Sequence, residues 1–260
     1  MSKISHLSYS SVNAYLLCPA SWKFRYLDKT PAPTSPNLVF GSAFHDTIEA
    51  FLTREDTSVP LDVIWLECWN EQLNSGRNSS IAWGDNNAID MAEVGFHMFQ
   101  TEEIAQTIDA IKPLIQDDNP VLEKFIELRI PGVPVPIIGY IDIITADGVP
   151  CDFKTAGRKW YPKKAQDETQ PVFYLAALNQ EGYNLNPDPK FRHYIFTKTK
   201  NPVVQVFETT RTVGEMINLF GTVTQVWRGI ESEVFPRNQG TWKCSEKWCS
   251  YWSICRGATR

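Results

Sequence analysis

Two aspartates and a lysine stand where short apolar strands are expected. Asp142 lies inside the run Tyr-Ile-Asp-Ile-Ile, and Asp152 is followed two residues later by Lys154. Aspartate is depleted in strands, so carboxylates at these positions need a reason. Strand side chains alternate between faces, so Asp152 and Lys154 share one face. Two carboxylates beside an ammonium suit a hard divalent cation, although a buried ion pair that only joins two strands is an alternative.

A turn joins the two strands that carry these charges. Asp147 and Gly148 stand between the apolar runs, and an Asp-Gly pair in that position is typical of a β-hairpin. Pairing across the hairpin would bring Asp142 to the same end of the sheet as Asp152. The hairpin therefore predicts one site built from both strands.

Further strands are expected on either side of the hairpin. Residues 121–130 alternate between apolar and polar side chains, and residues 133–138 continue as an edge or irregular strand through two prolines. Glu127, on the polar face, is either a second acid near the metal or half of a surface ion pair. Residues 193–197 and 203–208 complete the predicted sheet.

Helices are expected both before and after the sheet. The region 60–118 is expected to be largely helical, with loops near 74–78 and 83–87. A first helix is predicted to begin at Ser8 or Ser10 and to end at Pro19. Other helices are predicted over residues 20–26, 41–52, 168–178 and 212–230. His45 lies beside the apolar stripe of the helix 41–52, where it is a metal ligand or an ordinary core or surface histidine. Gln170 and Tyr174, four residues apart, share one helix face.

Composition limits the classes of protein to consider. The chain has 260 residues, is 43% hydrophobic and 21% charged, and carries a net charge of −5. These values suit one globular domain with room for a small appended lobe. No apolar run approaches the length of a membrane span, and no signal-peptide core is present at the N-terminus. We therefore expect a soluble, cytoplasmic protein without a membrane partner.

An acidic chain needs a local basic patch to bind nucleic acid. The most basic stretch follows the hairpin, and it interleaves Arg158, Lys159, Lys163 and Lys164 with two aromatic residues. Such a mixture suits a phosphate backbone with bases stacked beside it. A solvated loop has the same composition.

The cysteines suggest a second metal centre. Of six cysteines, Cys244, Cys249 and Cys255 lie within twelve residues, and Cys18 stands at a predicted helix end. Four thiols can hold a [4Fe–4S] cluster or a tetrahedral zinc ion, or can remain ordinary thiols. Disulfides are not expected in a cytosolic chain. The other two cysteines, at positions 68 and 151, are expected in the core.

The order of these residues resembles a known family. His45, Asp142, the triplet Asp152-Phe-Lys154, and then Gln170 with Tyr174 resemble the PD-(D/E)XK nucleases of the RecB C-terminal type. The Cys18 region and the cysteine-rich tail resemble the iron–sulfur subgroup, which includes the AddB nuclease domain and CRISPR-associated RecB-like exonucleases. The resemblance covers most of the chain except residues 55–120. One spacing departs from the subgroup, since four residues rather than two separate Cys244 from Cys249.

The resemblance implies an α/β fold. We expect a restriction-endonuclease-like central mixed β-sheet flanked by helices, forming a single nuclease domain over residues 1–260. Residues 53–120 would be a helical insertion. Cys18 and residues 236–260 would form a metal-cluster staple that joins the two ends of the chain.

The resemblance also implies an activity and roles for residues. His45, Asp142, Asp152 and the carbonyl of Phe153 would bind Mg²⁺ or Mn²⁺, Lys154 would act on the attacking water and the transition state, and Gln170 and Tyr174 would position the lysine and the DNA. The implied enzyme is a DNA exonuclease for single-stranded or opened ends in recombination, repair or mobile-element processing, working alone or beside a separate helicase or recombination protein. Alternatives are a structure-specific endonuclease of the same fold and a non-catalytic DNA-binding scaffold.

Overall fold

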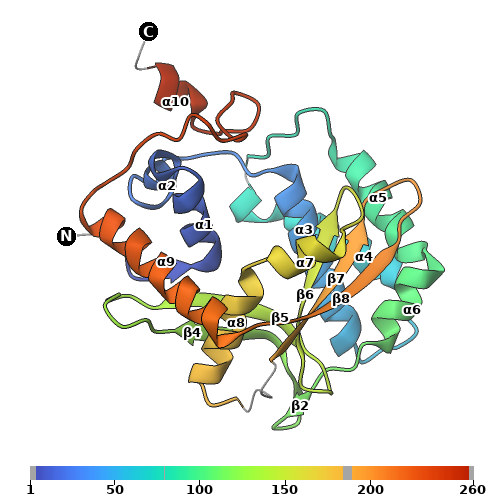
Figure 1. Ribbon diagram of the computed structural model, residues 1–260. Helices are drawn as coiled ribbons and strands as arrows, with labels where there is room; N and C mark the ends of the chain where they lie inside the picture. The colour runs from blue at the N-terminus through green and yellow to red at the C-terminus, as the bar shows by residue number, and fades with distance from the viewer. Residues whose placement is uncertain (1–3, 79, 184–188, 258–260) are drawn as a thin grey trace.

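A mixed β-sheet forms the centre of the computed structural model, which describes residues 4–78, 80–183 and 189–257 (Figure 1). Its strands are β1 (Leu7–Ser8), β4 (Leu122–Leu128), β5 (Ile137–Ile144), β6 (Pro150–Ala156), β7 (Lys190–Thr197) and β8 (Val204–Thr210). They run in the order β1-β5-β6-β7-β8, and β4 also pairs with β5. The β1–β5 and β6–β7 pairs are parallel and the others antiparallel. This arrangement confirms the predicted mixed sheet.

Helices cover both faces of this sheet. The elements on one side are α3 (Pro36–Thr53), α4 (Leu61–Asn74), α5 (Ala88–Gln100) and α6 (Glu102–Ala110), and on the other α1 (Tyr9–Leu17), α8 (Gln170–Gln180) and α9 (Val213–Glu231). Three short helices complete the set: α2 (Pro19–Tyr26), α7 (Pro162–Asp167) and α10 (Trp252–Gly257). Each side has its own apolar cluster, and the sheet separates the two. None of the described helices has the length and apolar character needed to cross a bilayer.

The structure revises several predicted boundaries. The helices of the region 53–120 end at Ala110, and the short antiparallel strands β2 (Ile115–Gln116) and β3 (Asn119–Pro120) follow, with η1 (Gly76–Asn78) between α4 and α5. The strand predicted from residue 133 begins only at Ile137, because Pro134 and Pro136 cannot donate to a ladder.

The hairpin and the first helix form as expected. Strands β5 and β6 pair antiparallel through Ile143–Cys151, and Gly148 takes a φ of +77° in the turn, which suits glycine. Ser8 caps α1 by accepting a hydrogen bond from the backbone N–H of Ser11. Local capping and turn chemistry therefore fix these two elements.

Helix α8 packs closely against β5 at Gly139. A Cβ atom placed on Gly139 would lie 2.9 Å from Phe173 and 3.2 Å from Tyr174. A side chain there would push α8 away from the sheet. The glycine thus sets how near Tyr174 comes to the charged end of the hairpin.

The C-terminal tail returns to the first two helices. The hydroxyl of Tyr15 donates to the carbonyl of Val234 at 2.6 Å, and the side-chain amide of Asn238 donates to the carbonyl of Leu17 at 2.9 Å. Phe235 stacks on Trp22 with ring centroids 5.9 Å apart. These contacts place the cysteine-rich tail beside Cys18; residues 258–260 of the predicted tail segment lie outside the described residues.

Candidate active site

The predicted charged residues meet where β5 and β6 separate. The ladder between these strands includes the pair Ile143–Cys151, and the two aspartates lie one residue beyond it. The backbone N–H of Phe153 donates to Asp142 Oδ2 at 2.6 Å. From α3, His45 places Nδ1 3.5 Å from Asp142 Oδ1, and its Nε2 donates to the carbonyl of Phe153 at 2.8 Å. The predicted His45, Asp142 and Phe153 therefore share one site.

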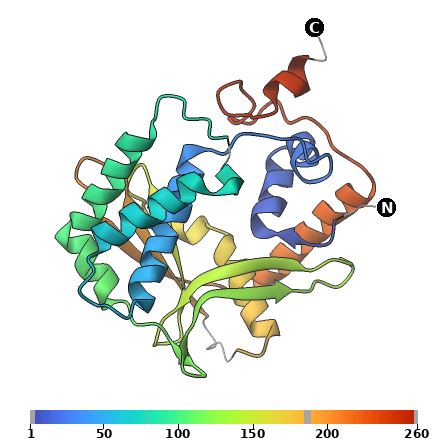
Figure 2. The ribbon, with the colours of Figure 1, turned by 180° about the vertical axis from the view of Figure 1, so that it is seen from behind.

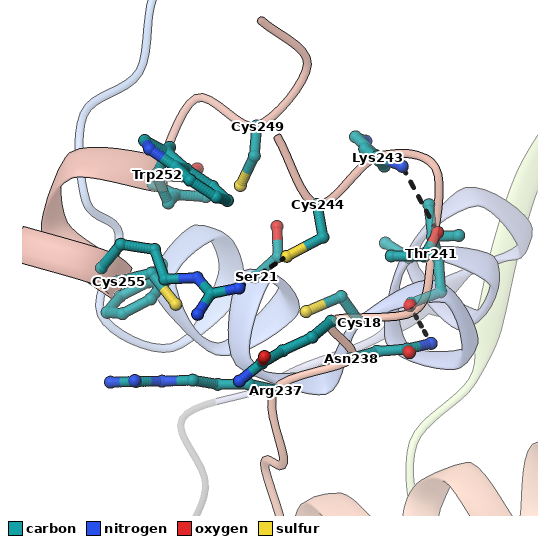
Figure 3. A pocket seen from close by; sticks show the side chains of 16 residues that line it. Cys18, Ser21, Arg237, Asn238, Thr241, Lys243, Cys244, Cys249, Trp252 and Cys255 are labelled. Carbon is teal, nitrogen blue, oxygen red and sulfur yellow. Dashed lines mark hydrogen bonds between the residues drawn. The ribbon is translucent and has the colours of Figure 1, made fainter. Parts of the chain in front are cut away.

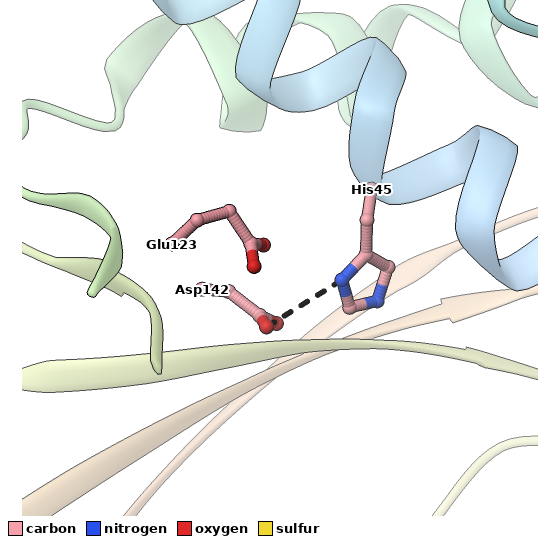
Figure 4. A group of neighbouring side chains, drawn as sticks. All are labelled: His45, Glu123 and Asp142. Atoms are coloured by element: carbon pink, nitrogen blue, oxygen red, sulfur yellow. Dashed lines mark ion pairs between the residues drawn. The ribbon is translucent and has the colours of Figure 1, made fainter. Parts of the chain in front are cut away.

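A third acid, Glu123, also belongs to this site. One ligand atom from each of His45, Glu123 and Asp142 lies within 4.8 Å of the others, as Figure 4 shows. Glu123 lies on β4 between the residues that pair with Ile143 and Ile141, so it stands opposite Asp142. Its φ of +43° is in the left-handed region, which is strained for a glutamate. Sequence reasoning missed this residue.

Glu127, the acid considered on the same strand, has another role. It forms an ion pair with Arg129 at 2.7 Å on the surface of the hairpin. This contact is the surface ion pair considered from the sequence. Only the strand register determines which of the two glutamates reaches the site. The pairing of β4 with β5 puts Glu123, and not Glu127, opposite an aspartate.

Asp152 and Lys154 form an ion pair at the same place. Lys154 Nζ lies 2.6 Å from Asp152 Oδ1. The other oxygen, Asp152 Oδ2, is buried and has no hydrogen-bond partner among the described residues. An unpaired buried carboxylate oxygen is costly, so it calls for a cation or a donor that the chain does not supply.

The protonation of these groups follows from burial and crowding. Burial alone would lower the pKa of His45, but the charge of Asp142 and its hydrogen bond raise that pKa to about 9. Burial raises the pKa of Asp152 to about 6, against the attraction of Lys154. For Asp142, burial is outweighed by His45, Lys154 and the Phe153 N–H, so its pKa is lowered. Asp152 and Asp142 keep the pKa of Lys154 raised despite burial, so the amine carries its charge.

Gln170 and Tyr174 share a helix face, as predicted. The amide of Gln170 donates to the Tyr174 hydroxyl at 2.6 Å, and Tyr174 is buried. Burial, together with the negative charges of Asp152 and Asp142, raises the pKa of Tyr174. Its phenol therefore stays protonated beside the acidic group.

The donor set fits a hard divalent cation. It consists of an imidazole, the carboxylates of Glu123 and Asp142, the carbonyl of Phe153, and the unpartnered oxygen of the buried Asp152. Oxygen ligands with one imidazole suit Mg²⁺ or Mn²⁺. The ammonium of Lys154, which pairs with Asp152, adds a positive charge at the edge of this set.

Removing the charge of Glu123 should stabilise the metal-free protein. Burial and the nearby Asp142 raise its pKa to about 7, so at pH 8 the folded state holds an unfavourable charge. We expect Glu123→Gln to raise the metal-free unfolding free energy by about 1 kcal/mol at pH 8, a value reduced for solvent screening, and to have little effect at pH 5 where the acid is already protonated. Denaturant titration without added metal measures both values.

Glu127→Gln is the matched control for this prediction. It removes an equal charge four residues along the same strand, from the pair with Arg129. A gain at pH 5 as large as at pH 8, or an equal gain for Glu127→Gln, would contradict the assignment of Glu123 to the group formed with His45 and Asp142.

The basic stretch, which follows β6 in the chain, lines a pocket. Arg158, Lys159 and Lys164 line a hollow of about 450 Å³ together with Tyr9 and Tyr161. Lys164 Nζ lies 4.0 Å from the centre of the Trp160 ring. Lys163, by contrast, pairs with Asp167 at 2.6 Å on the exposed side of α7. Three of the four predicted basic residues therefore line one hollow, and Lys163 is not among the residues that line it.

The four cysteines surround a second pocket. Cys18 from the junction of α1 and α2 faces the three tail cysteines, and Figure 3 shows the four sulfur atoms directed toward a common space. None is in a disulfide. Burial raises the pKa of Cys249, and the nearby thiols of Cys18, Cys255 and Cys244 raise it further. Cys68 and Cys151 are buried in the core, as expected.

Comparison with known proteins agrees with this geometry. The crystal structure of a candidate exonuclease from Eubacterium rectale has a similar fold, with a TM-score of 0.55 and 11% identity over 90% of this chain and 84% of that one. No curated protein matches by sequence. The model of the PD-(D/E)XK nuclease superfamily matches residues 6–256. The chain belongs to this nuclease superfamily.

Proposed function

We propose that the protein is a metal-dependent deoxyribonuclease that degrades DNA from single-stranded or opened ends. The observation that carries the proposal is the convergence of His45, Asp142 and Asp152 with the ammonium of Lys154. Membership of the nuclease superfamily supports hydrolysis of nucleic acid. A separate helicase or recombination protein would supply the opened ends. We also propose that the nuclease is of the RecB-like type.

In this proposal, five groups of the chain bind the metal ion. When bound there, Mg²⁺ or Mn²⁺ supplies Lewis-acid polarisation of a phosphate oxygen and a water of lowered pKa. His45, Glu123, Asp142, Asp152 and the Phe153 carbonyl hold that ion. The raised pKa values of His45 and Glu123 keep protons on these two side chains. Both protons would have to leave for the ion to bind.

Lys154 acts as a charged donor in this proposal. Asp152 holds its ammonium, and a raised pKa keeps the proton on the amine. A positive group fixed beside the scissile phosphate stabilises the charge that develops there. Holding the attacking water by a hydrogen bond fits that protonation state better than removing its proton. Gln170 fixes the Tyr174 hydroxyl near the negative charges of Asp152 and Asp142.

A cleavage assay tests the proposal. We expect the wild-type protein to shorten a labelled linear single strand with Mg²⁺ or Mn²⁺, and Asp152→Ala to leave it intact. A circular single strand, which lacks ends, should resist the wild type. Cutting of the circle would favour the structure-specific endonuclease, and binding without any cutting would favour the non-catalytic scaffold.

We propose further that Cys18, Cys244, Cys249 and Cys255 bind a [4Fe–4S] cluster. A tetrahedral zinc site holds its sulfurs about 3.8 Å apart, given a Zn–S distance of about 2.3 Å. Among the described residues, no three cysteine sulfurs lie within 4.8 Å of one another. The wider spacing supports a larger group than one zinc ion. Brown protein containing four irons would agree, and stoichiometric zinc would contradict the cluster.

The basic pocket is the proposed path of the DNA backbone, and its lysines make a matched pair. Lys164 lines the pocket, whereas Lys163 is neutralised by Asp167. In an Asp152→Ala background that cannot cut, Lys164→Ala should reduce the salt slope of single-strand binding by about 0.7, and Lys163→Ala by much less. Anisotropy titrations at several salt concentrations measure the slopes. Equal slopes in all three proteins would contradict this path.

A further inference from the structure

An exposed aromatic pair lies on the outer face of the β4–β5 hairpin. Phe125 and Tyr140 are direct partners in the ladder, with ring centroids 5.5 Å apart at an interplanar angle of 63°. Phe125 is 47% exposed and Tyr140 is 52% exposed. Neither ring belongs to the buried clusters of the described residues. A cross-strand aromatic pair stabilises its two strands, and the exposed faces of these rings are also open to a ligand.

The opposite face of the same hairpin is fully used. Ile126 is buried, and Gly139 lies against Phe173 of α8. Figure 2 shows the hairpin in front, with α8 and α9 behind it. No described helix lies over the hairpin in this view, so its outer face is open to a ligand.

The aromatic pair adjoins the candidate active site. Tyr140 precedes Asp142 by two residues on β5, and its ladder partner Phe125 lies beside it on β4. Strand side chains two residues apart point to the same face, about 7 Å from each other along the strand. The rings are therefore one step along the sheet from the acids that would hold the metal.

We propose that Phe125 and Tyr140 stack on an unpaired base of the DNA strand whose phosphate is cut. This inference rests on the proposed nuclease function and names its substrate class more closely. A base next to the scissile phosphate lies within reach of side chains one step from the metal ligands. In a duplex both faces of that base are occupied by its neighbours, so only a strand end that is already unpaired can use the rings.

The surroundings of the pair favour a base over a protein partner. A charged pair lies beside the rings, Glu127 of β4 with Arg129 just past the end of that strand. A stable protein interface needs a much wider apolar surface than two rings. A single base needs only one free ring face, and such stacking tolerates any sequence.

The test combines changes in the enzyme and in the substrate. Phe125→Leu with Tyr140→Leu keeps apolar side chains in the strands but removes both rings. We expect this double variant to lose about tenfold in kcat/KM on linear single strands. We also expect the wild type to lose about as much on a strand with an abasic site next to the cut bond. The double variant should cut the intact and abasic strands equally well.

Two comparisons keep the result clear. Val206→Ala changes an exposed strand residue on β8 and should behave as the wild type; a melting curve of the double variant checks its folding. A folded double variant that keeps the wild-type preference for the intact strand would overturn the stacking role. A wild type that cuts no DNA would instead overturn the proposed function.

Discussion

Substituting alanine for Lys154 is expected to lower the rate of DNA cleavage by about 10³-fold while metal binding persists. The loss follows from removing a fixed positive charge beside the phosphate, which costs about 10²–10³ in other preorganised sites. Lys154 Nζ contacts Asp152 and is not among the oxygen and imidazole donors around His45. Cleavage of a labelled single strand and calorimetric titration with Mn²⁺ measure the two properties separately.

Lys124→Ala is the control for this variant. Lys124 of β4 also pairs with a carboxylate, that of Glu181 at the C-terminal end of α8, and strand alternation puts it on the face opposite to Phe125. Its removal should leave cleavage within about twofold of the wild type, because a partly exposed ion pair contributes little. If Lys154→Ala lost its affinity for Mn²⁺ along with its activity, the lysine would be part of the metal site rather than a separate charge.

The sequence singled out several of the charged residues that the structure brings together. Charges interrupt the apolar strands at Asp142, Asp152 and Lys154, which makes these residues easy to recognise. The short turn at Gly148 joins the two strands as an antiparallel hairpin. His45 was ambiguous by itself. Its position ahead of Asp142, Asp152 and Lys154, in the order that resembles the nuclease family, suggested that it faces the sheet. The neighbouring residues on its helix gave no such indication.

Glu123 could not be predicted because its role depends on register. It lies outside the regular backbone of its strand, with a φ of +43°, and only the pairing of β4 with β5 sets it opposite Asp142. A shift of one residue would have turned another side chain to the site. Glu127 looked equivalent from sequence, and its partner Arg129 is also only two residues away.

The strand boundaries and the basic stretch show the same limit. Pro134 and Pro136 precede β5, which begins only at Ile137, because a proline has no N–H to donate to the ladder. Among the basic residues, composition gave no reason to separate Lys163 from Lys164. Helix α7 separates them, since it puts Lys163 within reach of Asp167 four residues on.

Loss of the cysteine-bound group should destabilise the fold more than any surface change. Cys18 and the tail cysteines enclose nearly the whole chain, so a link between them restricts the unfolded state. By analogy with a covalent cross-link of a long loop, its loss costs about 4–5 kcal/mol, or about 10 °C in Tm for a chain of this size. We expect Cys18→Ala, or prolonged chelation, to lower Tm by that amount and to remove the colour of the protein.

Cys68→Ala separates the cluster from ordinary packing. Cys68 is a buried thiol between α3 and its neighbours, outside the tail pocket, so its loss leaves only a small cavity and should keep the colour. The tail also holds to α1 and α2 through Tyr15, Phe235 and Asn238, so some attachment survives without the cluster. A Tm for Cys18→Ala equal to that of the wild type would therefore mean that these contacts alone secure the tail and that the thiols have no structural role.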